Sequence, residues 1–171
     1  MLRIPAIVLS LFLLAAPWTA NARAPDLADV WNGAEIKWRD IRSGIYESSK
    51  SGKPVVMVFH ASWCTACKKY RAVFFDKGIV EASKDFVMIL IDGDADKASN
   101  GAFAPDGTYV PRTIFLDAEG NIQSQLKGAG DPQYPHSIDI NGPAELLALM
   151  QRARETIKDA PPPQQSAGDK T

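Results

Sequence analysis

The sequence predicts an α/β domain with a four-stranded mixed β-sheet, assembled as a β-α-β unit followed by a β-β-α unit and flanked by helices on both faces. Residues 55–59 and 86–91 are short, continuously apolar runs, typical of strands that are buried on both faces. A helical pattern lies between them, and a hairpin and a second helical pattern follow. A chain of 171 residues is long enough for one such domain.

The first 22 residues have the pattern of a secretory signal peptide. Arg3 precedes a 13-residue, largely apolar stretch, which is shorter than the roughly 20 residues that a membrane-spanning helix needs. We therefore expect cleavage after Ala22 and no stable membrane insertion of the mature protein, with an uncleaved anchor or a buried N-terminal helix as the alternatives. Residues 23–36 would then be an N-terminal extension of a domain at 37–158.

Helical and strand patterns alternate through the first half of this domain. Trp38, Ile41 and Ile45 recur at helical spacing, which predicts a helix that ends just before Gly52. The first buried strand follows at 55–59, and a second helix starts at the cysteine pair. This arrangement places the cysteines between a buried strand and a helix.

A hairpin and a helix complete the predicted domain. Residues 113–116 and 122–126 are apolar and flank a turn that contains Gly120, which predicts two antiparallel strands. Apolar residues then recur at spacings of four and three from Leu146 onward, which predicts a C-terminal helix. Residues 159–171 are rich in Pro, Gln, Ser and charge, so we expect a disordered tail.

The charge balance argues against polyanionic partners. The chain has 19 Lys and Arg against 20 Asp and Glu, for a formal net charge of -1. It therefore lacks the basic excess that attracts nucleic acid or an anionic membrane surface, and we expect no nucleic-acid partner. We also expect a monomer, because no apolar periodicity is evident beyond the core faces.

The only two cysteines, Cys64 and Cys67, form a Cys-x-x-Cys motif at the start of a helix. Unpaired backbone N–H groups and the positive end of the helix dipole favour the thiolate of Cys64, which makes it the expected nucleophile. Cys67, one turn on and deeper, is expected to resolve the mixed disulfide. The motif thus predicts a thiol-disulfide oxidoreductase that acts on protein thiols or disulfides and needs no organic cofactor and no metal.

Two other interpretations of the cysteines remain open. A disulfide staple is one, although so small a loop removes little entropy from the unfolded chain. A Cu(I) or Zn(II) binding module that uses Cys64, Cys67 and His60 is the other. His60 is otherwise expected to be half-buried, with a role in proton transfer as an alternative, and His136 is expected to be a solvated surface residue.

Residues 51–68, which include Trp63 and the cysteines, and residues 103–112 resemble the anterior-gradient family of small thioredoxin-like proteins. The motif is also similar to the C-terminal domain of the bacterial transmembrane thiol reductase. The resemblance implies a thioredoxin fold over residues 31–157. It also identifies Val110–Pro111 as the family's cis-proline and implies that Trp63, Val110 and Pro111 contact substrate. The preceding segment, 93–110, has no periodicity, so we expect a long loop at the substrate-binding rim.

The chain also departs from the family pattern. Val58 stands where thioredoxin has a buried aspartate, so the usual proton acceptor for the second cysteine is missing, and His60 and Glu47 are the candidates to replace it. Ala72 stands where thioredoxin has a kinking proline, which predicts a straighter helix.

The C-terminus lacks the retention signal of the endoplasmic-reticulum relatives, so we expect a periplasmic rather than a secreted or lumenal location. The sequence leaves the redox partner unidentified. A redox-inert chaperone that binds peptides in the groove beside Pro111 is a third hypothesis, and the presence of both cysteines argues against it.

Overall fold

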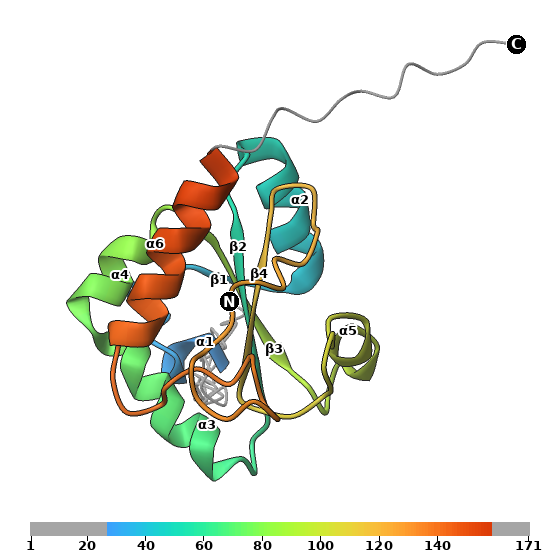
Figure 1. The fold of residues 1–171 in the computed structure, drawn as a ribbon, viewed down its shortest axis with the longest axis vertical. Helices are drawn as coiled ribbons and strands as arrows, with labels where there is room; N and C mark the ends of the chain where they lie inside the picture. Colours follow the sequence, from blue (N-terminus) through green and yellow to red (C-terminus); the bar gives the residue numbers. More distant parts are fainter. Residues whose placement is uncertain (1–26, 159–171) are drawn as a thin grey trace, which may run out of the picture.

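The computed structural model describes residues 27–158, so the expected signal peptide at 1–22 and the expected tail at 159–171 lie outside the described residues. At its centre is a four-stranded sheet in the order β1-β3-β2-β4 (Figure 1). Strands β1, β3 and β2 are parallel, and β4 is antiparallel to β2. The predicted α/β architecture with a mixed sheet is confirmed. The strands are β1 (Trp38–Arg39), β2 (Val55–His60), β3 (Val87–Asp92) and β4 (Arg112–Leu116).

Helices cover both faces of the sheet (Figure 1). Helix α2 (Ile41–Ser51) packs on one face, whereas α4 (Lys77–Ser83) and α6 (Ala144–Lys158) lie together on the other. The remaining helices are α1 (Leu27–Val30), α3 (Thr65–Tyr70), the 3-10 helix η1 (Arg71–Phe75) and α5 (Lys97–Ala102). Across residues 27–158, none of these helices combines the length and the apolar character that crossing a membrane would require.

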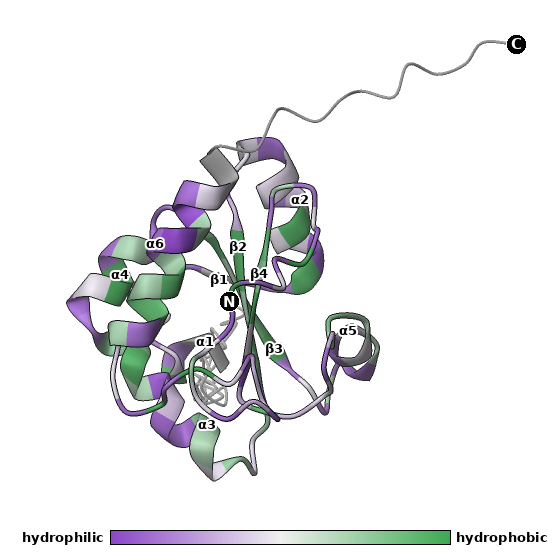
Figure 2. Ribbon diagram, viewed as in Figure 1, coloured by the Kyte–Doolittle hydropathy of each residue, from purple (hydrophilic) through white to green (hydrophobic). Residues whose placement is uncertain are grey.

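The strands separate two layers of core. Successive side chains of a strand point to opposite faces, so Val55 and Met57 pack toward α2 while Val56 and Val58 pack into the layer that holds the cysteine pair. Figure 2 shows the central strands as hydrophobic along most of their length, as strands buried on both faces must be. Trp31, from the segment that the sequence predicts to be an extension, is buried in the same layer as the cysteines.

The fourth strand of the sheet is not the one that the sequence predicts. Residues 122–126 form only an isolated antiparallel bridge, between Ile122 and Leu116. The chain then leaves the sheet, because the backbone N–H of Leu126 donates to Gln123 in a turn. The fourth strand is β1, which pairs with β3 at the opposite edge.

Trp38 therefore lies in a strand and not in the helix that its spacing predicts. Helix α2 begins at Ile41, because the side chain of Asp40 accepts a hydrogen bond from the backbone N–H of Ser43. Gly52 adopts a left-handed conformation with φ 70° and ends the helix, as expected.

The prediction of a straighter helix, made from Ala72, is also wrong. The segment after the cysteines is divided into α3, η1 and α4. Asp76 has an extended backbone, and its side chain accepts hydrogen bonds from the N–H groups of Gly78 and Ile79, so a new helix starts there. Gly78 lies within α4.

The long loop expected at 93–110 contains helix α5. The side chain of Asp96 caps this helix by accepting the backbone N–H of Ser99. An Asp three residues before a Ser is the available signal for the helix start, but six residues are too few to show a helical period.

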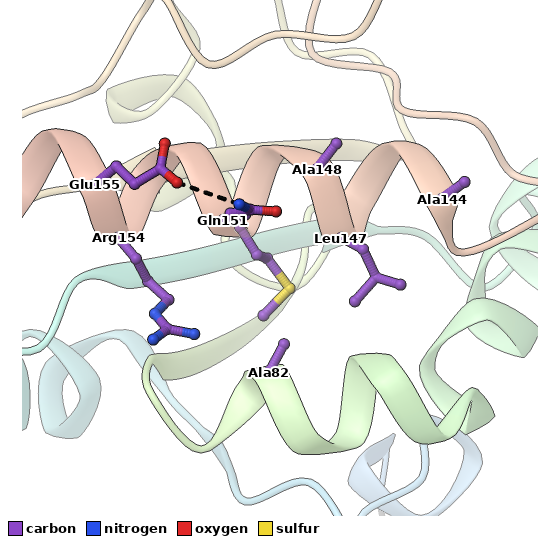
Figure 3. Close-up of a pocket in the computed structure, with 8 residues that line it drawn as sticks. Ala82, Ala144, Leu147, Ala148, Gln151, Arg154 and Glu155 are labelled. Atoms are coloured by element: carbon purple, nitrogen blue, oxygen red, sulfur yellow. Dashed lines mark hydrogen bonds between the residues drawn. The ribbon is translucent and has the colours of Figure 1, made fainter.

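A groove of about 680 Å³ lies between α4 and α6 (Figure 3). Ala82 lines it from α4, and Leu147, Gln151 and Arg154 line it from α6. No cysteine or histidine is among its lining residues. Thiol chemistry must therefore lie elsewhere, at the carboxyl end of β2.

Candidate active site

Cys64 and Cys67 are joined by a disulfide at the start of α3, with their Cα atoms 5.2 Å apart. Cys64 is the N-cap residue of the helix, and its Sγ accepts a hydrogen bond from the backbone N–H of Cys67 at 3.0 Å. In the reduced protein the same N–H would stabilise a thiolate on Cys64. Their exposed fractions are 4% and 2%, so in the disulfide form Cys64 is scarcely more exposed than Cys67.

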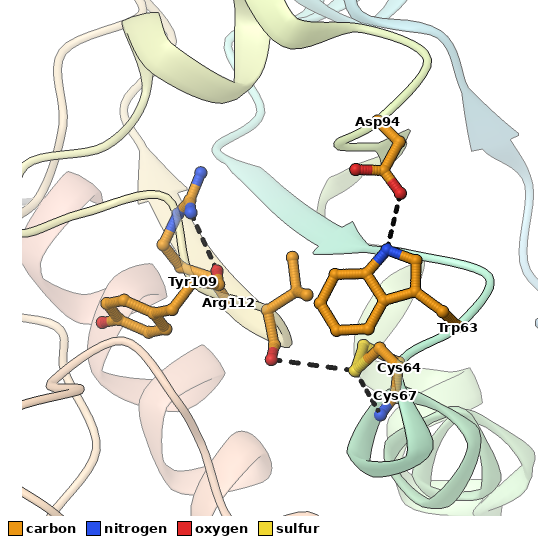
Figure 4. The surroundings of a disulfide bond; sticks show 7 residues. Trp63, Cys64, Cys67, Asp94, Tyr109 and Arg112 are labelled. Carbon is orange, nitrogen blue, oxygen red and sulfur yellow. Dashed lines mark hydrogen bonds between the residues drawn. A yellow bond between two sulfur atoms is a disulfide. The ribbon is translucent and has the colours of Figure 1, made fainter.

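The loop before β4 lies against the disulfide. The Val110–Pro111 peptide bond is cis, as the family resemblance implies. The carbonyl oxygen of Val110 lies 3.7 Å from the Sγ of Cys64 (Figure 4). Pro111 is buried and Val110 is half-buried, so a partly exposed residue stands directly beside the Sγ of Cys64.

Trp63 lies beside the disulfide on the open side of the site (Figure 4). Its exposed fraction is 67%, which is high for a tryptophan, and its indole Nε1 donates to the Oδ2 of Asp94 at 2.7 Å. This hydrogen bond fixes the orientation of a large apolar side chain that is otherwise open to solvent.

Arg112 is a residue of the site that the sequence argument missed. Its side chain is fully buried, with the guanidinium carbon 4.2 Å from the centre of the Phe59 ring. It donates hydrogen bonds to the carbonyl oxygen of Tyr109 and to two oxygens of Asn100, and so ties the cis-proline loop to α5. Burial lowers the pKa of this guanidinium. The sequence signal for this role is the charge of Arg112 next to an apolar strand, because a buried charge needs hydrogen-bond partners.

His136 is buried, which corrects the expectation of a solvated surface histidine. Its Nδ1 lies 3.0 Å from the Oδ1 of Asp106, and its backbone N–H donates to the hydroxyl of Tyr109 at 2.8 Å. The same hydroxyl donates to Asp106 at 2.6 Å. Burial and the bond to Asp106 raise the pKa of Tyr109. Together with Arg112, these residues hold the loop before Val110.

His60 lies at the end of β2, close to the cysteine pair. It lines a cavity of about 220 Å³ together with Cys67, Arg71 and Asp92. Its exposed fraction is 4%, so His60 is more deeply buried than the sequence predicts. Its Nε2 has no hydrogen-bond partner. Burial lowers the pKa of His60, and the charge of Asp92 opposes that shift.

Glu47 is held away from the cysteine pair. Both of its carboxylate oxygens accept hydrogen bonds from Arg39, at 2.6 and 2.7 Å. These hydrogen bonds lower the pKa of Glu47. Glu47 lines a different cavity, with Lys53 and Lys84, next to the amino end of β2.

The structure does not gather the ligands of the alternative metal site. Within residues 27–158, no group of three His, Cys, Asp or Glu side chains is arranged so that it could hold a metal ion. The proposed set of Cys64, Cys67 and His60 is therefore not such a group.

Another hollow opens beside the residues between the two cysteines. Its volume is about 400 Å³, and it is lined by Ala66 of α3 and by Tyr134, Ile138 and Ile140 of the segment between β4 and α6. Tyr134 also stacks edge-on against Tyr109, with ring centres 4.9 Å apart. Tyr134 therefore connects the wall of this hollow to the cis-proline loop.

Comparison with known proteins gives consistent matches. A family model described as thioredoxin-like matches residues 37–118. Anterior gradient protein 3 from Xenopus tropicalis is 31% identical over 162 residues, which cover 90% of this chain and 94% of that protein. The human anterior gradient protein 2 homolog is 25% identical over 130 residues, which cover 75% of this chain and 70% of that protein. A solved thioredoxin from Thermus thermophilus is similar in fold, with a TM-score of 0.53, 18% identity and coverage of 70% of this chain and 88% of that chain.

Proposed function

The chain belongs to the thioredoxin-like disulfide oxidoreductases, as a relative of the anterior gradient proteins, and we propose that it is an exported protein that exchanges disulfides with protein substrates through a mixed disulfide on Cys64. The observation that carries the proposal is the position of the Cys64–Cys67 disulfide, at a helix start and 3.7 Å from the carbonyl oxygen of the residue before a cis-proline.

In the reducing direction, the thiolate of Cys64 attacks one sulfur of a substrate disulfide, and the other substrate sulfur leaves as a thiolate. Cys67 then attacks the Sγ of Cys64 and releases the second substrate sulfur. The protein disulfide formed has lost two electrons, and the substrate disulfide has gained them. The oxidising direction is the same sequence in reverse.

The substrate in this proposal is an extended polypeptide segment. Val110 offers its backbone beside Cys64, and Trp63 and the hollow next to Ala66 offer apolar surface on either side. Backbone hydrogen bonds would bind any sequence, whereas the hollow would select side chains near the substrate cysteine.

The location we propose is the bacterial periplasm. The pattern of residues 1–22 supports export, and an oxidising compartment is where disulfide exchange is a normal activity.

A matched pair of cysteine variants tests the mechanism. With a disulfide-bonded peptide as substrate, Cys64→Ser should abolish turnover, whereas Cys67→Ser should accumulate a mixed disulfide that is visible by mass spectrometry. Full turnover by Cys64→Ser, or the absence of any adduct on Cys67→Ser, would contradict the proposal.

The reduction potential of the pair would give the direction of electron flow. Equilibration in graded glutathione buffers should place it between the roughly -270 mV of thioredoxin and the roughly -120 mV of a strong oxidase. A value near the lower limit would indicate a reductant that needs an electron donor, and a value near the upper limit would indicate a disulfide donor.

A further inference from the structure

The resolving cysteine needs a group that takes its proton. A thiol has a pKa of about 8.5 in water, and burial in apolar surroundings raises it, so Cys67 must be deprotonated before it can attack. Cys67 is buried, and the residue beneath the pair, Val58, has no proton-accepting atom. This step belongs to the proposed thiol-disulfide function, and the inference below rests on it.

His60 lies on the same face of β2 as the layer that holds Cys67. Alternation along the strand puts His60 on the side of Val56 and Val58, both of which pack in the cluster that contains the cysteines. The same cavity of about 220 Å³ is lined by His60 and by Cys67. A cavity of this size has room for water, and polar groups line it.

The Nε2 of His60 is buried without a hydrogen-bond partner. Buried polar atoms are rarely left unpaired, so such an atom beside a thiol needs an explanation. A role in which the atom exchanges a proton during the reaction supplies one.

Charged side chains surround the imidazole of His60 and affect how readily it takes up a proton. Lys68 of α3, Arg71 of η1 and Asp92 of β3 line the cavity, and Asp94 of the next loop also acts on the ring. Burial lowers the pKa of His60, and the two aspartates oppose the shift, so the imidazole is neutral at pH 7 and can be charged transiently.

We propose that His60 is the group that accepts the proton of Cys67, through water in the cavity that both residues line. The proton of the Cys67 thiol passes to Nε2 of the imidazole as the thiolate attacks the Sγ of Cys64. The bond between Cys64 and the substrate sulfur breaks, and the substrate leaves as a thiolate. The imidazolium then returns its proton to water or to the departing thiolate.

Glu47, the other candidate, is excluded as the acceptor by its contacts. Arg39 occupies both carboxylate oxygens, and the cavity that Glu47 lines does not include a cysteine. It therefore provides the matched control variant.

The test separates the two chemical steps. Reduced protein is mixed with 5,5′-dithiobis(2-nitrobenzoate), and the absorbance of released thionitrobenzoate is followed in a stopped-flow instrument. The first release reports attack by Cys64, and the second reports resolution by Cys67. His60→Gln should leave the first rate within about twofold and slow the second roughly 100-fold at pH 7, as is typical for loss of a general base. Glu47→Gln should change neither rate.

The pH profile excludes a merely structural effect. In the unsubstituted protein the second rate should be level above the pKa of His60 and fall below it. In His60→Gln the rate should rise about tenfold per pH unit until Cys67 itself ionises. Added imidazole should accelerate resolution by His60→Ala and not by the unsubstituted protein.

Two results would overturn the inference. One is an unchanged second rate in His60→Gln, and the other is a slow second rate in Glu47→Gln. Neither would affect the proposed function, which fails only if Cys64 does not attack at all. If the His60 variants do not fold, the imidazole of the unsubstituted protein can be titrated by NMR in both redox states, and identical titration curves would also refute the proposal.

Discussion

The hydrogen bond between Tyr70 and Thr113 ties the cysteine helix to the strand that follows the cis-proline, and its removal gives a sharp test of the packing. Tyr70 ends α3, Thr113 lies in β4, and their hydroxyl oxygens are 2.8 Å apart. Both residues are fully buried, so neither hydroxyl can turn to water when its partner is removed.

The costs of the two single variants should add up to more than the cost of the double variant. Tyr70→Phe leaves the Thr113 hydroxyl unpaired, and Thr113→Val leaves the Tyr70 hydroxyl unpaired, at about 1 to 3 kcal/mol each. The double variant removes both polar groups while keeping the shapes, so its cost should be close to that of one single variant. The coupling free energy is then about 1 to 3 kcal/mol.

Urea unfolding of the oxidised protein, followed by circular dichroism, measures these free energies. Tyr46→Phe is the matched control, because Tyr46 is 65% exposed and its loss of a hydroxyl should change stability by no more than about 0.5 kcal/mol. Strictly additive costs in the double variant would show that the two hydroxyls do not depend on each other, and would refute the argument.

Three further predictions concern positions outside this pair. Arg112→Lys should lower the unfolding free energy by roughly 3 kcal/mol, because a lysine cannot reach Asn100 and the cis-proline loop together; an unchanged urea midpoint would contradict this. Gly44→Ala should destabilise by about 1 to 2 kcal/mol despite its better helix propensity, because a Cβ there would lie 2.5 Å from the side chain of Ile89; calorimetry would detect the lower melting temperature, and a higher one would be the opposite result. Burial lowers the pKa of His60 below 6.5, so the unfolded chain binds more protons and stability should decline as the pH falls from 6.5 through the folded-state pKa; His60→Gln should show a shallower decline in urea titrations at several pH values.

The sequence predicted those parts of the fold whose physics is local. The buried strands β2 and β3 are continuous apolar runs, and the cysteines follow the first of them directly. Strand β1 could not be predicted, because two residues are too few for a strand period and Trp38 fits a helical spacing with Ile41. Trp38 and Arg39 are a strand only through their pairing with Met88 and Ile89.

The same division applies to the candidate site. The cysteine pair is a sequence motif, and the cis-proline was implied by the resemblance. The residues that hold the cis-proline loop are distant in sequence: Arg112 reaches Asn100, and His136 reaches Asp106. No periodicity or spacing connects a histidine to an aspartate 30 positions away, which explains why His136 was expected at the surface.

The two sides of the disulfide are built from different segments, and we expect them to affect different steps of the proposed reaction. The side that contacts Cys67 lies at the carboxyl ends of β2 and β3, where His60 and Asp92 line the cavity, so its chemistry should vary little with substrate. The side beyond Val110 is built from the segment between β4 and α6, where Tyr134, Ile138 and Ile140 line an open hollow. Because surface segments tolerate change more readily than paired strands, substrate selection should depend on that hollow, while the rate of resolution depends on the cavity behind Cys67.

Substitutions at Ile140 should accordingly change which peptides form the mixed disulfide without changing how fast a given mixed disulfide resolves. A change in the second rate alone would show that the two sides are coupled through Cys64.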